Sequence, residues 1–160
     1  MSFQIRKAAE KDIPQIISLI REFAEFENLS DWCEVTEGKL NEAIFGANAF
    51  VQSLVAFDGE TRVAYALFFP VFKSFRGERS MFLEDLYVSP NARGRGLGFA
   101  MLKEVAKIAK EQNCVRMDWQ ALKWNERAIN FYKNLGAESD DENFDFRLRG
   151  EPFQNLTQNQ

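Results

Sequence analysis

The stretch Arg93-Gly94-Arg95-Gly96-Leu97-Gly98 decides how the rest of this 160-residue chain is interpreted. An apolar run at 82–88 precedes it, and a turn at 89–91 lies between the two. After the glycines, apolar residues recur at helical spacing, at Met101, Leu102, Val105, Ile108 and Ala109. A strand, a glycine-rich loop and a helix together predict an anion site, because the first amides of a helix have no partner within the helix and its dipole is positive there.

The glycine spacing narrows the class of anion. Gly94-x-Gly96-x-Gly98 is not the G-x-G-x-x-G of a dinucleotide fold, and no G-x-x-x-x-G-K-[ST] occurs in the chain. This disfavours a dinucleotide-binding oxidoreductase and a Walker-type NTPase. The competing interpretation of the stretch is a glycine-rich helix entry with solvated arginines.

Composition and charge are those of a globular protein. A hydrophobic fraction of 46% and a charged fraction of 28% predict one domain at 1–150 with a polar, frayed tail at 151–160. A net charge of −4 without any basic run gives no support to nucleic-acid binding. No apolar run approaches 18 residues and no signal peptide is visible, so we expect a cytoplasmic protein without a membrane partner.

The chain contains no histidine. Ser-His-Asp and Cys-His catalysis are therefore excluded. Cys33 and Cys114 are far apart in sequence and cannot supply the usual zinc ligand set, so we predict no metal site and two unpaired thiols. Acid–base chemistry must come from Glu, Asp, Tyr, Lys or Cys.

Apolar periodicity predicts an α/β (α+β) fold, with a mixed sheet of about seven strands flanked by about four helices. Asp12 is expected to cap the first helix, Asp58-Gly59 to turn a hairpin, and Asn125 to cap the last helix before Gly136. The strand that follows the long helix should pair parallel to 82–88, because a helix crosses between them. The expected strands are 3–7, 50–57, 62–70, 82–88, 114–121, 137–139 and 144–148. Helices are expected from residue 13, over 36–45, after residue 98 and over 125–135. A loop is expected at 73–80.

Three carboxylates occupy positions where apolar residues are expected. Glu84 and Asp85 interrupt the apolar run at 82–88, where strict alternation places Glu84 with Leu86 and Asp85 with Tyr87. Alternation also groups Phe82 and Val88 with Glu84, and Leu83 with Asp85. Glu27 follows Ile20 by seven residues and so falls on the apolar stripe of the first helix if that helix continues. A structural salt bridge, or fraying of the helix before residue 27, is the alternative to a pocket that receives a cation.

Three segments together resemble the GCN5-related N-acetyltransferase (GNAT) superfamily. They are the glycine-rich stretch, with Arg93, Gly96 and Gly98 in the places of an Arg/Gln-x-x-Gly-x-Gly/Ala loop, the Trp-Asn-Glu run at 124–126, and Asn-Phe-Tyr-Lys-Asn-Leu-Gly-Ala at 130–137. The resemblance covers nearly the whole chain. The runs at 82–88 and 22–27 are similar to diamine (spermidine/spermine-type) and thialysine acetyltransferases, although Phe26 stands where polyamine enzymes commonly have Tyr.

The resemblance implies the GNAT fold, with a splayed parallel strand pair that holds acyl-CoA, and it implies roles for particular residues. Tyr132 would be the general acid, and Glu84 would act as base through water or bind the cation. The amine pocket would be lined by Phe26, Glu27, Glu84, Asp118, Trp119 and Gln120. The acetyl-CoA site would comprise Leu86, Tyr87, Val88, Arg93, Gly94, Arg95, Gly96, Leu97, Gly98, Phe99, Asn125, Arg127 and Ala128. A further family acid near the C-terminus stays open among Asp140, Asp141 and Glu142.

The implied function is transfer of acetyl from acetyl-CoA to a primary amine of a small di- or polyamine or a lysine-like substrate. Direct attack in a ternary complex, without a metal, is the expected route. A protein amine or an aminoglycoside remains an alternative acceptor, and a non-catalytic acyl-CoA-binding module is the alternative from another class. The resemblance also implies a homodimer.

Overall fold

The structure of the protein is a computed structural model that describes residues 3–158. These residues fall into two units, 3–120 and 121–158. The first unit contains a five-stranded sheet in the order β1-β2-β3-β4-β5. The strands are β1 (Gln4–Lys7), β2 (Gln52–Asp58), β3 (Thr61–Lys73), β4 (Glu78–Val88) and β5 (Arg116–Trp119).

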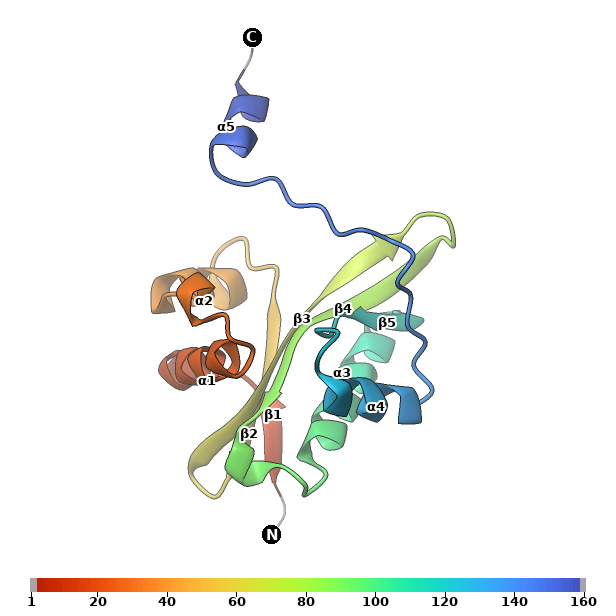
Figure 1. Ribbon diagram of the computed structural model, residues 1–160. Helices are drawn as coiled ribbons and strands as arrows, with labels where there is room; N and C mark the ends of the chain where they lie inside the picture. Colours follow the sequence, from red (N-terminus) through yellow and green to blue (C-terminus); the bar gives the residue numbers. More distant parts are fainter. Residues whose placement is uncertain (1–2, 159–160) are drawn as a thin grey trace. The chain divides into compact units, whose positions relative to one another are not determined.

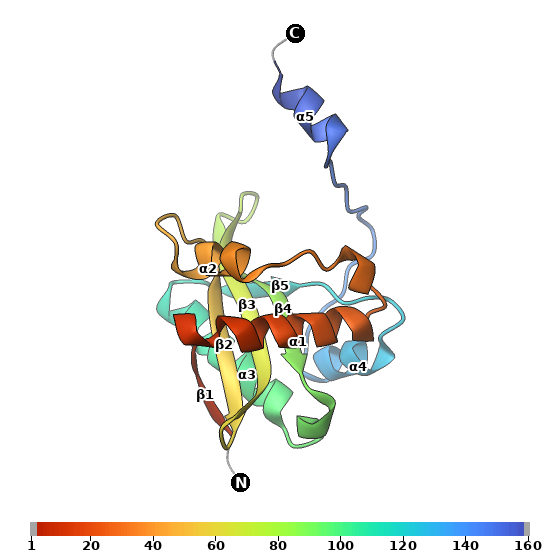
Figure 2. The ribbon, with the colours of Figure 1, turned by 90° about the vertical axis from the view of Figure 1, so that its left-hand side faces the viewer.

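Three longer helices cover the sheet of the first unit. Figures 1 and 2 show α1 (Ile13–Phe26) and α2 (Glu37–Phe45) on one face and α3 (Leu97–Glu111) on the other. The face under α1 and α2 holds a buried cluster that includes Ile16, Val55 and Tyr65. The α3 stripe is buried as predicted, at Leu97, Met101, Leu102, Val105, Ile108 and Ala109. This mixed arrangement confirms the predicted fold class.

The strand pairing follows the expected connectivity. All neighbouring strands run antiparallel except β4 and β5, which pair in parallel across the α3 crossover. The hairpin at Asp58-Gly59 forms, with Gly59 at a φ of 61°. The loop predicted at 73–80 is shorter than expected, because β3 continues to Lys73 and β4 already begins at Glu78.

The start of α1 differs from the prediction for Asp12. This residue stands at the N-cap position, but its carboxylate makes no bond to the helix. It accepts hydrogen bonds from the side chains of Arg6 and Arg62 and from the Ala9 amide instead. Asp12 therefore ties β1, β3 and the start of α1 together, while Pro14 occupies the first helical turn, where its missing N–H costs nothing.

The second unit contains α4 (Glu126–Asn134) and α5 (Glu151–Thr157). Asn125 caps α4 as predicted, since its Oδ1 accepts from the Ala128 amide at 3.2 Å. Gly136 has a φ of 88° just beyond the helix end. The frayed tail predicted at 151–160 is wrong for the described part of that range, because Glu151–Thr157 is helical, with Pro152 in the first turn.

The strands predicted at 137–139 and 144–148 do not form in the described part of the chain. Phe144 and Phe146 alternate with polar residues, which is the pattern of a half-buried strand, yet their side chains are 88% and 94% exposed. A strand exists only where a neighbour satisfies its amides and carbonyls, and the sheet here contains only β1 to β5. Residues 3–158 therefore contain five of the seven expected strands.

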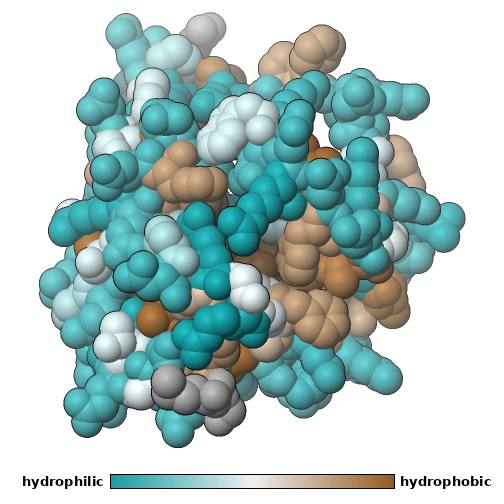
Figure 3. Space-filling view, turned by 60° about the horizontal axis from the view of Figure 1, so that its bottom comes forward, coloured by the Kyte–Doolittle hydropathy of each residue, from teal (hydrophilic) through white to brown (hydrophobic). Residues whose placement is uncertain are grey.

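The face of the molecule shown in Figure 3 is mostly polar. Hydrophilic side chains cover most of the face in Figure 3, and hydrophobic side chains gather mainly on its right-hand side. No helix in the described part of the chain combines the length and the apolar character needed to cross a membrane.

Candidate active site

The glycine-rich loop leads into the first turn of α3. Gly94 and Gly96 have φ values of 74° and 78°, a backbone conformation in which residues with a Cβ are strained. In the part of the chain that the structure describes, the N–H groups of residues 94–99 donate no hydrogen bond. Six consecutive free donors at a helix N-terminus fit the predicted binding of a pyrophosphate by this loop.

The two arginines of the loop contact the protein itself. Arg93 donates from Nε to the Val88 carbonyl at 2.8 Å, and its guanidinium lies over the rings of Phe26 and Tyr87, at 4.9 and 5.5 Å from the centroids. Arg95 forms an ion pair with Asp58 at 2.6 Å. Both side chains therefore contact neighbouring parts of the protein, and the backbone amides of residues 94–99 supply further donors at this loop.

The edge of β4 beyond residue 83 has no neighbouring strand in the described structure. β4 pairs with β5 only from Ser80↔Arg116 to Leu83↔Trp119. The predicted residues Leu86 and Val88, with Tyr87 between them, belong to the part of β4 that has separated from β5. Such an edge can add an extended, amide-containing ligand as if it were another strand, and this is the predicted splayed pair.

A β-bulge lies at Glu84. Leu67 of β3 pairs with Asp85 while the next residue, Phe68, pairs with Leu83, so Glu84 is the extra residue on β4. Opposite residues share a face, and Leu67 and Phe68 point to opposite faces. The bulge therefore turns Asp85 away from the face of Leu83, and the alternation predicted from the sequence is wrong at this point.

The bulge places two carboxylates in one cavity on the α1 face of the sheet. This cavity of about 370 Å³ is lined by four acidic residues, Glu27, Glu34, Glu84 and Asp85, and by no basic residue. The other lining residues are mainly apolar or aromatic, and they are Ile20, Phe23, Ala24, Leu29, Trp32, Cys33, Val35 and Tyr65. An acidic cavity with apolar walls suits an alkylammonium group.

Asp85 is the most deeply placed of these acids. Its Oδ2 accepts a hydrogen bond from the Tyr65 hydroxyl at 2.9 Å. Burial, with smaller contributions from the charges of Glu84 and Glu27, raises the pKa of Asp85 to about 6, although the Tyr65 hydrogen bond acts in the opposite direction. The pKa of the fully buried Tyr65 is itself raised by burial and by Asp85.

Glu27 lines the cavity although α1 ends one residue before it. It stands at the C-cap position of the helix, and burial raises the pKa of its carboxyl group. The helix ends before residue 27, as the alternative of a frayed helix end predicted. Glu27 nevertheless lines the cavity and does not lie in open solvent. Phe26 is not among the lining residues, because its ring lies beneath the Arg93 guanidinium.

The structure leaves the β5 residues Asp118 and Trp119, and Gln120 that follows, outside this cavity. Asp118 contacts Ser80, pairs with Arg116 at 2.6 Å and lies 3.8 Å from Lys73. Its pKa is lowered, mainly by the hydrogen bonds from Arg116 and Ser80, which outweigh burial. Such pairing is the structural role that any carboxylate in a strand could have, so contact between Asp118 and a substrate remains a prediction.

The remaining predicted residues lie in the second unit. Asn125 and Ala128 form the cap of α4, Arg127 lies in its first turn, and the Tyr132 ring packs 5.3 Å from that of Phe131. Asp140 accepts from the Glu142 amide at 2.8 Å and thereby shapes its own turn. The proposed roles of these residues toward acetyl-CoA and the substrate stay predictions.

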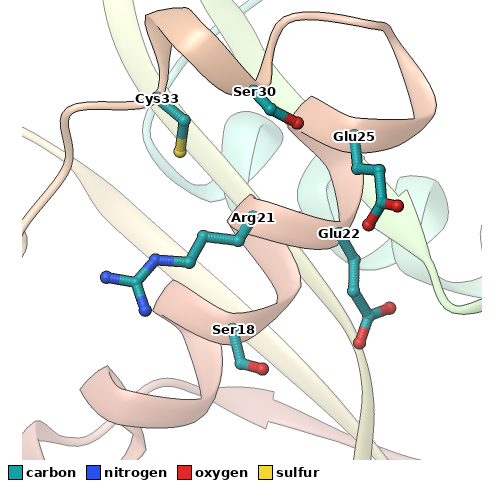
Figure 4. Close-up of a pocket in the computed structure, with 6 residues that line it drawn as sticks. All are labelled: Ser18, Arg21, Glu22, Glu25, Ser30 and Cys33. Carbon is teal, nitrogen blue, oxygen red and sulfur yellow. The ribbon is translucent and has the colours of Figure 1, made fainter.

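A second hollow lies on the outer side of α1. It has a volume of about 450 Å³ and is lined by Ser18, Arg21, Glu22, Glu25, Ser30 and Cys33. Figure 4 shows Arg21 pointing away from the two carboxylates. All of these residues except Cys33 are exposed, and Glu22 already accepts hydrogen bonds from Tyr87 at 3.3 Å and Ser89 at 3.0 Å. The cavity beside Asp85 is therefore the stronger candidate for substrate.

Sequence reasoning selected Glu84 and Glu27 for this cavity, considered Asp85 without selecting it, and gave no role to Glu34 or Tyr65. Asp85 was visible as a carboxylate within an apolar run, and the bulge that turns it toward α1 has no sequence signal. Tyr65 lies in an ordinary apolar strand pattern, so nothing in the sequence distinguished it from a core aromatic residue. The cysteines are unpaired as predicted.

Comparison with known proteins agrees with this geometry. The model of the acetyltransferase (GNAT) family matches residues 14–137. The chain belongs to this family. As a GNAT protein it is an N-acetyltransferase, and members of the family use acetyl-CoA as the acetyl donor.

Relatives of this GNAT protein cover nearly its full length. The thialysine N-epsilon-acetyltransferase of Mus musculus is 37% identical, over 97% of this chain and 97% of its own. The spermidine/spermine N(1)-acetyltransferase-like protein 1 of Homo sapiens is 35% identical over 84% of this chain, which corresponds to 20% of that protein. An integron cassette protein from V. cholerae superposes with a TM-score of 0.81 at 26% identity, over 99% of both chains.

Proposed function

We propose that this protein transfers acetyl from acetyl-CoA to a primary amine of a small di- or polyamine or a lysine-like amine. The observation that carries the proposal is the cavity beside β4, with Glu27, Glu34, Glu84 and Asp85 and no basic residue in its lining. An alkyl amine has a pKa of about 10.4 and arrives protonated at neutral pH. The names of the thialysine and spermidine/spermine relatives support an acceptor of this kind.

The carboxylates have two tasks in this proposal. They attract the ammonium group, and one of them accepts its proton so that the nitrogen lone pair becomes nucleophilic. Asp85, deeper in the cavity, is suited to hold the cation, while the more exposed Glu84 is suited to pass the proton to water. The chain contains no histidine that could take either role.

Backbone groups supply the acetyl-CoA side of the site. The free amides of residues 94–99 would hold the pyrophosphate, and the unpaired edge of β4 at 86–88 would hold the pantetheine arm. Acetyl-CoA brings the activated acetyl group. A β4 amide near Leu86 would stabilise negative charge on the carbonyl oxygen, a contribution of about 3 kcal/mol in comparable sites.

Tyr132 is proposed to donate a hydrogen bond to the departing sulfur. The new N–C bond replaces the C–S bond. The ammonium group loses one proton to a carboxylate and water before the attack and a second one after it, while the sulfur gains one proton, so that one proton in total goes to solvent. A phenol of pKa about 10 is a weaker acid than a thiol of pKa about 8.5, so full transfer from Tyr132 would be uphill by roughly 2 kcal/mol. The residue therefore acts mainly as a hydrogen-bond donor, and proton transfer comes late.

A homodimer and a cytoplasmic location belong to the same proposal. The homodimer is what the family resemblance implies, whereas the cytoplasmic location is the expectation from a sequence in which no apolar run approaches 18 residues. The sequence also offers no basic run for nucleic acid. Size-exclusion chromatography with light scattering would report the oligomeric state directly.

Release of CoA thiol from acetyl-CoA tests the proposed reaction. Thialysine, lysine, spermidine, spermine, putrescine and a blank would be compared from pH 7 to 9. Tyr132→Phe should lower kcat by about 100-fold while acetyl-CoA binding changes little, and Glu84→Gln should lower kcat/KM for the amine at least about tenfold. Glu10→Gln, an exposed change outside the cavity, is the matched control. Saturable CoA binding without turnover of any amine would contradict the proposal and favour a binding module.

A further inference from the structure

Tyr65 occupies an unusual place for a polar side chain. It lies in the middle of β3, it is 0% exposed, and its ring belongs to the cluster beneath α1. Its hydroxyl nevertheless reaches the cavity, where it donates to Oδ2 of Asp85 at 2.9 Å. Packing alone would be served equally well by phenylalanine, and a buried hydroxyl is retained at a cost unless it has a partner.

We propose that Tyr65 is a positioning residue for the amine acceptor, which keeps Asp85 ionised and oriented toward the cavity through this hydrogen bond. The inference rests on the proposed function, since it assigns a task to Asp85 in that reaction. It adds a residue on β3, outside every segment from which the function was inferred.

The surroundings of Asp85 explain why such a contact is needed. Glu84 is its neighbour on β4, Glu27 faces it from the end of α1, and Glu34 lines the same cavity. Cys33, also in the lining, is a further group that interacts with Tyr65. Burial and the nearby carboxylates all favour the protonated form of Asp85, and the hydrogen bond from Tyr65 favours the charged form.

The charge on Asp85 decides whether the cavity attracts an ammonium group at neutral pH. With a pKa of about 6, Asp85 is mostly ionised at pH 7. Removing a hydrogen bond to a charged group should move its titration midpoint upward by about one pH unit. At pH 6 the ionised fraction would then fall about fivefold, whereas at pH 8.5 both forms of the protein would be almost fully ionised.

The test compares wild type with Tyr65→Phe in two measurements. Carboxyl-carbon NMR of Asp85 in the ligand-free protein should show a midpoint about one pH unit higher in the variant. The kcat/KM of the variant for the amine should be about fivefold lower than that of wild type at pH 6. At pH 8.5 the difference should be less than about 1.5-fold. In a protein that already carries Asp85→Asn, adding Tyr65→Phe should change kcat/KM by the same factor at pH 6 and at pH 8.5.

The outcomes separate this inference from the proposed function. An unchanged Asp85 midpoint, or an equal loss of activity at pH 6 and 8.5, would overturn the inference and leave Tyr65 as a packing residue. If wild type acetylates none of the amines, the proposed function fails, while the NMR titration still tests the Tyr65–Asp85 contact. If Tyr65→Phe does not fold, 3-fluorotyrosine can replace Tyr65, because its hydroxyl is a stronger hydrogen-bond donor. This replacement should lower the titration midpoint of Asp85. An unchanged or higher midpoint would contradict the inference.

Discussion

At the scale of single residues, Asp85 shows how this protein gives up stability for a functional charge. Burial raises its pKa to about 6 from an ordinary 3.8, so the native state binds this proton more tightly than the unfolded chain. The stability associated with Asp85 is therefore complete below pH 3.8 and is lost as pH rises through about 6. Ionised Asp85 is a destabilising element at neutral pH.

Asp85→Asn should consequently stabilise the protein at pH 8 by about 1–3 kcal/mol, because the amide avoids burying a charge and can still accept from Tyr65. Near pH 4 the variant and the wild-type protein should have about the same free energy of unfolding. Urea unfolding at the two pH values measures it. A variant that is less stable than wild type at pH 8 would show that Asp85 is held by contacts stronger than those described here.

The sequence predicted the types of residue in the site better than their directions. Glu84 and Asp85 could be recognised because carboxylates inside an apolar strand need a reason. Their shared orientation could not, since one extra residue at the Leu67/Phe68 register shift reverses the alternation. The hydrogen bond from Tyr65 joins residues 20 positions apart on neighbouring strands, a distance over which local patterns carry no information.

At the scale of secondary-structure elements, the Asp12 network joins two strands to the start of α1. The Asp12 carboxylate is inaccessible and pairs with Arg6 at 2.6 Å and Arg62 at 2.7 Å. Both guanidinium groups also lie over the Phe57 ring, at 4.6 and 5.0 Å. These contacts hold the pKa of Asp12 well below its usual range, with hydrogen bonds outweighing the opposing effect of burial.

Asp12→Asn should therefore destabilise the protein by about 2–4 kcal/mol at pH 7, slightly less than a fully buried pair because Arg6 is 40% exposed. A lowered pKa means that this stability is present above the ordinary pKa of 3.8 and is lost as pH falls below it. The gap between wild type and variant should narrow on acidification below about pH 4. Denaturant curves at pH 7 and pH 3 measure this, and a gap that widens toward pH 3 would contradict the account.

The glycine loop allows a second comparison between elements. Gly96→Ala should cost about 1–2 kcal/mol, because residue 96 has a φ of 78°, and should also weaken CoA binding. Gly38→Ala is the control within α2, where a Cβ would meet only Thr36 Oγ1 at 4.0 Å, and it should stabilise by about 0.5–1 kcal/mol. Thermal unfolding compares the two. Equal effects of both substitutions would show that loop geometry does not depend on glycine.

Elements with long, regular periodicity were predictable and those that need a distant partner were not. The buried stripes of α1 and α3 follow from spacing, and so does the parallel pairing of β4 with β5. The alternation at 144–148 has the same appearance as a true strand, but pairing depends on a free neighbouring edge that local sequence does not reveal. The polar composition of 151–157 predicts a frayed tail, although Pro152 stands where a helix can begin.

At the scale of the whole molecule, acetyl-CoA binding at the proposed site should be coupled to folding. A ligand that binds only the native state at a hundredfold excess over its Kd stabilises by about 2.7 kcal/mol. CoA and acetyl-CoA should therefore raise the Tm, and NAD should leave it unchanged because the glycine spacing is not that of a dinucleotide fold. Differential scanning fluorimetry tests this directly. If NAD raised the Tm as much as CoA does, a dinucleotide-binding oxidoreductase would again be a candidate function.

A competition among amines for limiting acetyl-CoA tests most directly whether the protein acetylates small alkyl amines. Thialysine, lysine, spermidine, putrescine and an aminoglycoside would be mixed at equal concentration with the wild-type protein, and the acetylated products would be identified by mass spectrometry. Because all acceptors share one enzyme and one donor, product ratios report relative kcat/KM. We expect the main product to be a small alkyl amine that carries one acetyl group, in excess over any acetylated aminoglycoside. Acetylation of the aminoglycoside alone, or of no amine while CoA still binds, would contradict it.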